Sequence, residues 1–569
     1  MAEDEKQKIR KHRHPGSGRR HTRPVPRGRQ VDPRAQDEVR GLLGDGPRRR
    51  DLLIEYLHRL QDHYHCLPAS RLAALAHEMR LSLTEVYEVA TFYAHFDVVD
   101  EQDEPLPEIT VRVCDSLTCS LYGGDDLLAN LQKAHGANVR IVRAPCMGHC
   151  DTAPVAEVGH NFADHATVDA VNDLIRRKDT HAHVPDYVGF DAYRADGGYG
   201  LVEALDRKET SIADIQDALG KASLRGLGGA GFPTARKWQF VQAEPGPRYF
   251  CVNADEGEVG TFKDRHYLES DPHRFLEGVL IAGRAVEAKA VYIYLRDEYP
   301  AAREILLREM AAVKAAGLHG GMEMHLRRGA GAYICGEESA MIESIEGKRG
   351  LPRHKPPFVA QVGLFGRPTL VQNVETVFWI RDIVEKGAAW FTGQGRHDRT
   401  GLRSFSVSGR VARPGVKLAP AGITMQELLD EYCGGMAEGH SFKGYLPGGA
   451  SGGILPASMA NIPLDFGMLE KHGCFVGSHA VVVLSHKDDI KAVALNLMKF
   501  FEDESCGQCT PCRVGTEKMV KLMSQPKWDQ PLMDELARTM TDASICGLGQ
   551  AAANPLNAVL KYFREDVTS

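Results

Sequence analysis

The sequence predicts an α/β multidomain protein. Its 569 residues are enough for three or four domains, each with its own core. Helical and strand periodicities alternate along most of the chain. Eight of the 13 cysteines fall into two groups, and the hydrophobic content of 43% is ordinary for a globular protein.

The first part of the chain changes period twice. Residues 1–35 are rich in Arg, Lys, His and Pro, and they predict a disordered basic tail. The alternative is an arm that docks on an acidic partner surface. Residues 36–96 carry apolar side chains at helical spacing, with an N-cap at Ser82 and a capping partner at Glu85. A strand–helix–strand pattern follows, over residues 109–113, 125–134 and 139–142.

The remaining elements follow in order. Residues 176–200 predict a polar connection, and residues 200–395 alternate helix and strand signals around a buried strand at 291–295. Short strands with Gly and Pro turns are expected over 396–480, notably at 404–409 and 480–484. The rest is predicted to be mostly helical. The domain boundaries are therefore placed at 1–35, 36–185, 195–395, 396–480 and 487–569.

The C-terminal cysteine group has the spacing of a cluster ligand set. Cys506, Cys509 and Cys512 form a C-x2-C-x2-C run, and Cys546 follows in sequence. Each iron of a 4Fe–4S cube takes one thiolate, and close spacing lets three sulfurs converge from one turn. These four residues are therefore predicted to hold a 4Fe–4S cluster.

A second quartet follows the two strands of the small domain. Cys114 and Cys119 come after the first strand, and Cys146 and Cys150 after the second. Four thiolates from adjacent loops can supply two per iron to a 2Fe–2S cluster. A structural zinc site is the alternative, although zinc ribbons favour C-x2-C spacing, which neither pair has.

The composition and the N-terminal sequence argue against nucleic-acid binding, a membrane span and an export signal. The net charge of −7 gives no reason to expect nucleic-acid binding. No run of 18 apolar residues predicts a membrane span, and no apolar signal core or twin-arginine signal is expected at the N-terminus. Reduced, metal-bound thiolates favour a cytoplasmic location.

A glycine-rich loop and several acidic segments indicate a cofactor pocket. Residues 225–234 contain a formal G-x-G-x-x-G, but the preceding residues read as helix, so a Rossmann domain is rejected. Such a loop still lets backbone N–H groups approach a phosphate or a flat ring. Polar or acidic segments recur at 253–258, 329–338, 353–358 and 372–376.

These segments, in this order, resemble the NADH-oxidising flavoprotein subunit of respiratory complex I and its soluble relatives. The motifs are the glycine loop, Asn253–Glu258, Gly329–Glu338, Lys355–Phe358 and Glu504–Arg513. Residues 36–185 resemble the thioredoxin-like 2Fe–2S subunit that pairs with that flavoprotein. The resemblance implies a non-Rossmann αβ domain for FMN and NADH, a β-grasp-like insert and a helical 4Fe–4S bundle.

The resemblance also implies roles for individual residues. Loop residues and a lysine would line the cofactor phosphates: Gly226, Gly228, Gly229 and Lys237. A second set would hold FMN: Asn253, Asp255, Gly336, Glu337, Asn373 and Thr376. A third would contact the dinucleotide, the first two by stacking: Phe232, Phe240, Glu258, Glu338, Lys355 and Phe358. No general acid or base is expected, because FMN passes the hydride itself.

Fusion of both halves in one chain is more typical of soluble NAD-linked enzymes. The chain resembles in particular the beta subunits of NAD-dependent formate dehydrogenases that contain molybdenum or tungsten. Diaphorase subunits of soluble NAD-reducing hydrogenases and NADH:quinone oxidoreductases are alternatives. The resemblance implies a large partner subunit that holds the metal and its pterin, with electrons passing through the clusters to FMN and then to NAD. A zinc-stabilised ligand-binding scaffold is the non-redox alternative.

Overall fold

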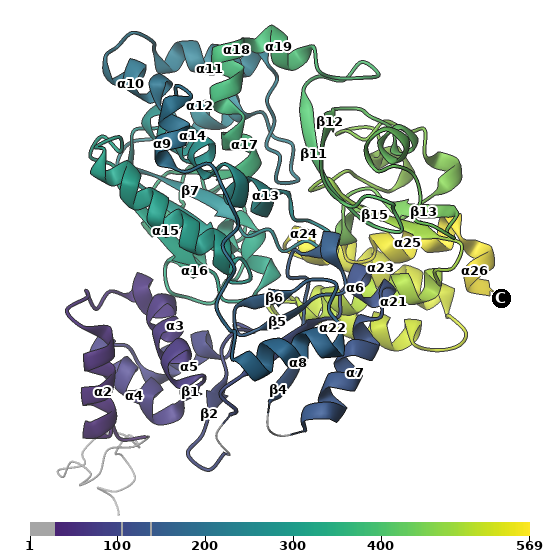
Figure 1. Ribbon diagram of the computed structural model, residues 1–569, viewed down its shortest axis with the longest axis horizontal. Helices are drawn as coiled ribbons and strands as arrows, with labels where there is room; N and C mark the ends of the chain where they lie inside the picture. Colours follow the sequence, from purple (N-terminus) through teal and green to yellow (C-terminus); the bar gives the residue numbers. More distant parts are fainter. Residues whose placement is uncertain (1–28, 104–105, 137–138, 569) are drawn as a thin grey trace, which may run out of the picture.

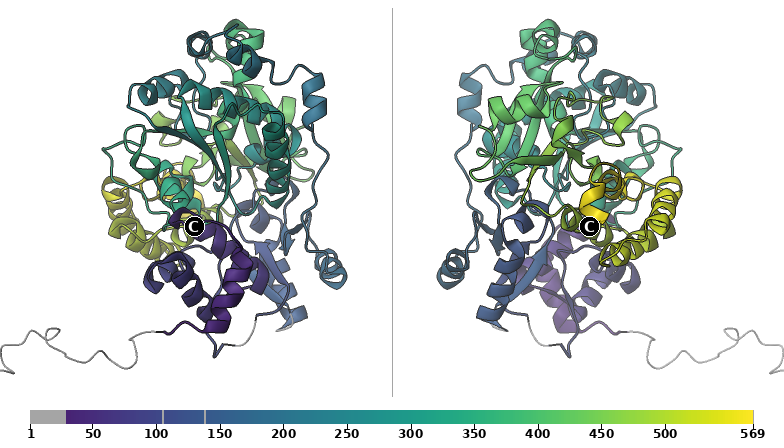
Figure 2. Two further views of the ribbon diagram at one scale, coloured as in Figure 1. Left: turned by 90° about the vertical axis from the view of Figure 1, so that its left-hand side faces the viewer. Right: turned by 90° about the vertical axis from the view of Figure 1, so that its right-hand side faces the viewer.

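The computed structural model describes residues 29–103, 106–136 and 139–568, arranged as one assembly of helices and sheets (Figure 1). The N-terminal helices and the small cysteine-bearing sheet lie together beneath the central part of the molecule, as both side views show (Figure 2). In Figure 1, the insert (residues 402–485) and the C-terminal helices (residues 490–568) lie on one side of the molecule. The helices of the central part (residues 200–392) lie on the other side. Among the described residues, none of the helices has both the length and the apolar content needed to cross a bilayer.

Most of the predicted basic tail lies outside the described residues, but its last part is ordered. Arg29 pairs with Asp100 at 3.1 Å, and helix α2 begins at Pro33 with Ala35 buried. The boundary at residue 35 is therefore too late. Asp32 caps α2 by accepting a hydrogen bond from the Arg34 backbone N–H. Aspartate is also common in loops, so the sequence alone did not reveal this helix start.

The N-terminal part is helical, as predicted. Ser82 and Glu85 form a reciprocal capping box at the start of α5, which confirms the sequence-based N-cap. The elements are α2 (Pro33–Leu43), η1 (Arg50–Leu52), α3 (Leu53–Tyr64), β1 (Leu67–Pro68), α4 (Ala69–Met79), α5 (Leu83–Ala90) and β2 (Val98–Val99). Fully buried leucines of α3 and α4 form the core of this part.

The small sheet confirms the strand–helix–strand prediction. Its order is β4-β3-β5-β6, and β3 pairs in parallel with β4 because helix α7 makes the crossover between them. The elements are β3 (Thr110–Cys114), α6 (Leu117–Leu121), α7 (Gly124–His135), β4 (Arg140–Ala144), η2 (Cys150–Thr152), β5 (Ala156–Val158), β6 (Asn161–Ala163) and α8 (Val168–Arg177).

The connection over 176–200 differs from the prediction because it contains a short helix, α9 (Phe190–Ala195). Tyr193 in this helix is buried, and its hydroxyl donates to the Glu277 carboxylate at 2.6 Å. Phe190 of the same helix packs against the rings of Tyr199 and His273. The helix has only six residues, which is too short to show a helical period.

The central part is a parallel sheet of order β10-β7-β8-β9. Its strands are β7 (Arg248–Ala254), β8 (Ala288–Leu295), β9 (Glu323–Arg328) and β10 (Thr369–Asn373). The surrounding elements are α10 (Gly200–Asp206), α11 (Ile212–Lys221), α12 (Thr234–Gln242), α13 (Lys263–Ser270), α14 (Pro272–Ala285), α15 (Pro300–Ala315), η3 (Tyr333–Gly336), α16 (Glu338–Ile345), η4 (Leu364–Gly366), α17 (Val374–Phe378), α18 (Ile380–Lys386) and α19 (Ala388–Thr392).

The carboxyl ends of these strands explain why polar segments recur along the sequence. Asn253 is the last residue but one of β7 and is the register partner of Asn373, which ends β10. The segment that begins at Gly329 directly follows β9. Parallel strands present their carboxyl ends at one edge of the sheet, where ligands bind in such folds. Segments far apart in the sequence therefore meet at one site.

The insert is a mixed sheet of order β12-β11-β15-β13-β14. It confirms the strands predicted at 404–409 and 480–484. The elements are β11 (Leu402–Gly409), β12 (Gly415–Pro420), α20 (Met425–Glu427), η5 (Leu428–Tyr432), β13 (Phe442–Leu446), η6 (Ala450–Gly452), β14 (Leu455–Pro456), η7 (Ala457–Met459), η8 (Glu470–His472) and β15 (Ala480–Ser485).

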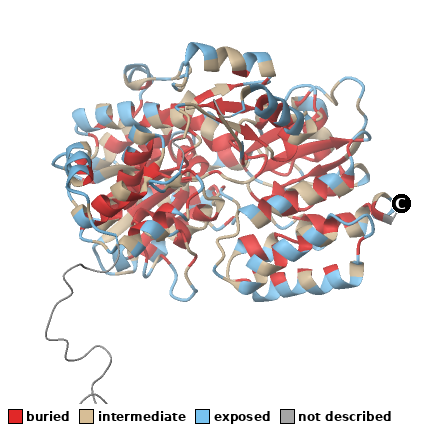
Figure 3. Cartoon of the chain, turned by 90° about the horizontal axis from the view of Figure 1, so that it is seen from below, coloured by how far each residue is buried: buried red, intermediate tan, exposed pale blue. Residues whose placement is uncertain are grey.

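The C-terminal part is a helical bundle, as predicted. Its helices are α21 (Ile490–Asp503), α22 (Thr510–Met523), α23 (Gln530–Ala543), α24 (Gly547–Ala551), α25 (Asn554–Tyr562) and α26 (Arg564–Thr568). Buried residues, red in Figure 3, line the inner faces of these helices and fill the sheets, while the outer helix faces are exposed. Cys509 and Cys546 are the N-cap residues of α22 and α24.

Candidate redox site

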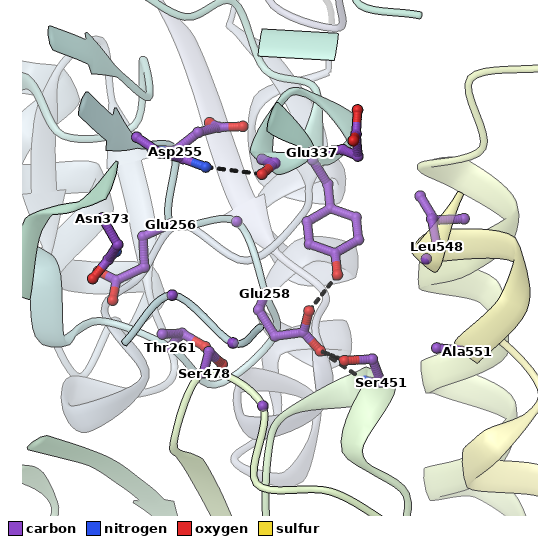
Figure 4. Close-up of a pocket in the computed structure, with 18 of the residues that line it drawn as sticks. Asp255, Glu256, Glu258, Thr261, Glu337, Asn373, Ser451, Ser478, Leu548 and Ala551 are labelled. Carbon is purple, nitrogen blue, oxygen red and sulfur yellow. Dashed lines mark hydrogen bonds between the residues drawn. The ribbon is translucent and has the colours of Figure 1, made fainter. Parts of the chain in front are cut away.

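A cavity of about 530 Å³ opens at the carboxyl ends of the central strands (Figure 4). Its lining combines three parts of the molecule: the central sheet, the insert and the C-terminal bundle. Half of the residues expected to bind cofactor line it: Gly228, Gly229, Asn253, Asp255, Glu258, Gly336, Glu337 and Asn373.

The glycine-rich loop forms one wall and confirms the rejection of a Rossmann domain, since it lies between helices α11 and α12 with no strand before it. A Cβ atom at Gly228 would come within 3.0 Å of the Asn373 Cβ, so only glycine lets the loop pack this closely. The Leu227 backbone N–H donates to the Thr376 hydroxyl at 2.9 Å. Thr376 therefore supports the loop from behind and does not line the cavity, and neither does Gly226.

Asp255 is the residue whose contacts suit a hydroxyl-bearing ligand. It lines the cavity, and its Oδ2 atom is buried with no hydrogen-bond partner in the described part of the chain. Burial raises the pKa of this carboxyl well above its usual range. An unpaired buried oxygen is costly unless a ligand satisfies it. The orphaned acceptor and the glycine cradle together fit flavin mononucleotide, whose ribityl chain carries hydroxyl donors.

Glu258 is partly buried against the insert. Its carboxylate accepts hydrogen bonds from the Tyr333 hydroxyl, the Ser451 backbone at 2.7 Å and the Ser451 hydroxyl at 2.8 Å (Figure 4). Burial raises its pKa, although these donors oppose the shift. The carboxylate therefore joins the central part to the insert at the cavity wall.

Three charged residues that were expected to contact the phosphates or the dinucleotide lie beside the cavity: Lys237, Glu338 and Lys355. The Lys355 Nζ contacts Glu337 at 2.9 Å and Glu338 at 3.0 Å, and the Lys237 Nζ contacts Glu338 at 3.5 Å. Burial acts to raise the pKa of Glu338, but the charges of Lys237 and Lys355 outweigh it and lower that pKa. Glu337 lines the cavity and contacts Lys355, so this group adjoins the cavity lining.

The predicted stacking residues lie on the surface next to this group. The rings of Phe232 and Phe240 are 6.0 Å apart and tilted by 42°, and the Arg236 guanidinium lies over both. Phe232 lies just before α12, and Arg236 and Phe240 lie on it, one turn apart. Phe358 is 55% exposed, which is unusual for such a large apolar side chain. Exposed rings of this kind can stack on a planar ligand.

The first cysteine quartet converges in a buried space. Cys114, Cys119, Cys146 and Cys150 are all buried free thiols, and the Sγ atoms of Cys146 and Cys150 are 3.3 Å apart. The pKa of Cys119 is raised by a hydrogen bond with Cys114, by burial and by the nearby Cys146, so the two pairs do meet. The Arg296 side chain donates to the Cys146 carbonyl at 2.6 Å and to the Glu256 carbonyl, which joins the quartet to the cavity wall.

The second quartet lies at the ends of the bundle helices. Cys506, Cys509 and Cys546 are partly exposed and Cys512 is buried. Burial raises the pKa of Cys512 to about 11, and the neighbouring Cys509, Cys546 and Cys506 add to the shift. Gly547 and Leu548, which directly follow Cys546, line the cavity. Four convergent thiols without disulfides fit an iron–sulfur cluster, whose irons stabilise the thiolate form.

Family comparisons agree with this arrangement. Residues 39–179 match a thioredoxin-like 2Fe–2S ferredoxin model, residues 219–382 the Nuo51 FMN-binding domain, and residues 492–569 the NADH-ubiquinone oxidoreductase-F iron–sulfur binding region. An NADH-quinone oxidoreductase chain of Rhizobium meliloti is 40% identical over 399 residues, which cover 67% of this chain and 94% of the relative. The corresponding NADH-quinone oxidoreductase chain of Aquifex aeolicus is 41% identical over 411 residues, covering 70% of this chain and 93% of the relative.

The chain belongs to the family of the complex I 51 kDa subunit. Its N-terminal extension is the thioredoxin-like 2Fe–2S domain, fused in front of the family's own domains. A chain of an NAD+-reducing NiFe-hydrogenase, solved in the H2-reduced state, has a TM-score of 0.79 at 31% identity. The match covers 92% of both chains, so the fused arrangement occurs in a solved structure as well.

Family membership confirms the predicted fold class and cofactors. The chain is an NADH dehydrogenase module of the diaphorase type, with FMN, a 2Fe–2S cluster and a 4Fe–4S cluster. The zinc alternative for the two quartets is thereby set aside. Neither the formate dehydrogenase assignment nor the binding role of each single residue follows from family membership.

Several cavity residues were not found from the sequence. They come from four stretches outside the segments singled out above: Thr261, Lys263 and Asp264; Ser451; Phe475, Gly477 and Ser478; and Gly547, Leu548, Gln550, Ala551 and Asn554. Lys263 is only 1% exposed and contacts Asp264 and Glu375, each at 2.9 Å. A buried lysine has no distinctive sequence pattern, although the acidic run before it was a partial signal. Leu548 and Ala551 face the cavity from the bundle (Figure 4).

Proposed function

We propose that this chain is the diaphorase subunit of an NAD-dependent formate dehydrogenase of the cytoplasm. It would pass electrons, reversibly, between NAD and a large partner subunit that holds molybdenum or tungsten on a pterin. When bound, FMN converts between single electrons and a hydride, which neither the clusters nor NAD can do alone. The work of the chain itself is to hold the cofactors, keep them apart from water and set their electrostatic surroundings.

One observation carries the electron-transfer part of the proposal: both cysteine quartets adjoin walls of the same cavity. The bundle residues that follow Cys546 form one wall. Arg296 bonds the Cys146 carbonyl on one side and the Glu256 carbonyl of the cavity lining on the other. An electron could therefore reach the cavity from either cluster without a large movement of the chain.

The cavity and its border suggest a division of labour among the predicted residues. We assign FMN to the cavity, held by Asn253, Asp255, Gly336, Glu337 and Asn373, with Gly228 and Gly229 against it. Thr376 and Gly226 would act by fixing the loop. We assign the dinucleotide to the residues beside the cavity. Phe232, Phe240 and Phe358 would stack on it, and Lys237, Glu338 and Lys355 would make polar contacts with it. Glu258 would shape the wall between the two.

The formate assignment rests on the resemblance of the fused sequence to formate dehydrogenase beta subunits. A hydrogenase is the second candidate, favoured by the solved NAD+-reducing NiFe-hydrogenase chain that is similar over 92% of both chains. The two candidates place the same module on different partners. The chemistry of the partner, and not the geometry of this chain, separates them.

Purification of the tagged chain from its native cells, without oxygen, tests the proposal. A large co-purifying subunit with molybdenum or tungsten, pterin and formate-dependent NAD+ reduction is the expected result. Nickel with H2-dependent NAD+ reduction would replace formate dehydrogenase by hydrogenase. A colourless chain that lacks iron, inorganic sulfide and flavin would overturn the redox assignment altogether.

A further inference from the structure

Three metal-binding side chains meet where the N-terminal helices contact the central part. His58 and Asp62 lie one turn apart on α3, and His95 lies just beyond α5. One donor atom from each side chain lies within 4.8 Å of the others, and the two imidazole rings are 5.0 Å apart. The histidines are buried, while Asp62 is partly exposed and opens the group to solvent.

Hydrogen bonds fix how each histidine presents its ring. The His58 Nε2 donates to the Gly329 carbonyl at 2.8 Å, since a carbonyl can only accept. The His95 Nδ1 lies 2.6 Å from a carboxylate oxygen of Asp297. The other nitrogens, Nδ1 of His58 and Nε2 of His95, are buried and have no hydrogen-bond partner among the described residues.

This pattern is the one that metal-binding histidines show. Such a histidine donates its second N–H to a carboxylate or a backbone carbonyl, which fixes the tautomer and leaves the other nitrogen free for the metal. Asp297 and Gly329 are in these two positions. Two unpaired buried nitrogens in one small group would otherwise be unfavourable.

We propose that His58, His95 and Asp62 bind a divalent transition-metal ion, with Zn²⁺ as the expected occupant. Two imidazoles and one carboxylate suit zinc and its neighbours better than calcium or magnesium, which prefer oxygen ligands. The position left open by three protein ligands would take a water molecule from the solvent side. The site is separate from both cysteine quartets and from the cavity, and nothing in the proposed electron transfer requires it.

The nearby charges allow this occupant. Asp62 and Asp297 both contact the Arg328 guanidinium, which lies 2.8 Å from Asp62. The two carboxylates outweigh the single arginine, so a dication meets a net negative environment. Asp62 is 47% exposed and would share its carboxylate between Arg328 and the metal.

A metal here would fasten the N-terminal helices to a loop of the redox site. The His95 backbone donates to the Ala330 carbonyl at 3.1 Å, and the Ala94 backbone to the Gly331 carbonyl at 3.2 Å. The same loop continues to Gly336 and Glu337 of the cavity. The expected role of the ion is structural: it holds the fused N-terminal part on the segment that leads to the cavity.

Zinc content of the full-length, cluster-loaded chain tests the proposal. The wild type and the variants His58→Gln, His95→Gln and Asp62→Asn are equilibrated with Zn²⁺, desalted and measured for zinc, iron and flavin. His63→Gln, an exposed residue of the same helix, is the matched control. The wild type and the control should keep roughly one zinc per chain, and the two histidine variants less than about a tenth of that. Zinc held adventitiously by cysteine would be equal in all variants.

A second measurement covers the possibility that the histidine variants fold poorly. Removing zinc from the wild type with a chelator that leaves its iron content unchanged should lower Tm by several degrees, and adding Zn²⁺ back should restore it. Asp62→Asn should lose most of the zinc while keeping iron and flavin. Equal zinc in the wild type and all variants, or a wild-type Tm that does not respond to zinc, overturns the proposal.

Discussion

At the scale of single residues, Asp255 is the described cavity side chain that has a buried oxygen atom left without a hydrogen bond. Its Oδ2 atom has no hydrogen-bond partner among residues 29–103, 106–136 and 139–568, and Arg296 is the main positive charge acting on the carboxyl. A carboxylate held this way is unfavourable in the empty protein and favourable toward a ligand with hydroxyl donors. A residue whose contacts are unfavourable without a ligand is expected at a binding site.

The substitution Asp255→Asn should therefore stabilise the flavin-free chain at high pH. The folded-state pKa of Asp255 is raised, so its stabilising effect is complete while the carboxyl is protonated and is lost as the pH rises through that pKa. Asparagine cannot ionise. The Tm advantage of the variant should be larger at about pH 8.5 than at about pH 5.5, measured on FMN-free protein. An advantage independent of pH would mean that the carboxyl does not titrate in this range.

Glu338 lies outside the cavity but between two lysines, at 3.0 Å from Lys355 and 3.5 Å from Lys237. We expect Glu338→Gln to raise the KM for NADH by about tenfold, which corresponds to ~1.4 kcal/mol. The variant loses a charged acceptor for ribose hydroxyls and loosens both lysines. Glu304→Gln, on an exposed position of α15, is the control. An unchanged KM for NADH would remove Glu338 from the dinucleotide site.

Elements with local signals were predictable, and surfaces made by distant elements were not. The cap of α5 and the buried strand β8 each follow from a few neighbouring residues. Ser451 and Leu548 line the same cavity as Asp255 although they are far from it in the sequence. Their place depends on how the parts pack together, which no periodicity records. Helix α9 was missed because its six residues are too few to show a repeated pattern.

The glycine loop leaves little space for an added side-chain atom near the cavity. We expect Gly228→Ala to reduce FMN content strongly, because the new Cβ would press on the Asn373 Cβ at 3.0 Å and push the loop from the strand end. Gly220→Ala, in α11 just before the loop, would meet only the Ala235 Cβ at 4.0 Å and is the control. FMN per chain is measured after purification. Equal FMN content in both variants would show that the loop tolerates displacement.

On the scale of the whole molecule, the cavity depends on several parts at once. The central sheet supplies Asp255, the insert Ser451 and the bundle Leu548, and Arg296 bonds the cavity wall to the small sheet. The cysteine spacings predicted both clusters correctly, because ligand geometry is local and chemically specific. The partner could not be predicted in the same way, since a diaphorase module serves several catalytic subunits with the same internal geometry.

Cys509→Ser tests whether electrons pass through the bundle. Cys509 caps α22, and the segment after its fellow ligand Cys546 lines the cavity, so a cluster held by these cysteines would adjoin the cavity. Reduction of ferricyanide by NADH needs only the flavin, and we expect it to stay within about twofold of the wild type. Transfer between NADH and the co-purified partner should fall by more than about tenfold. Cys66→Ser, at a partly exposed cysteine outside both quartets, is the control and should change neither activity. If both activities fall equally while the flavin content holds, the bundle cluster supports the cavity structurally and does not carry the current, and electrons must then enter through the small sheet and Arg296.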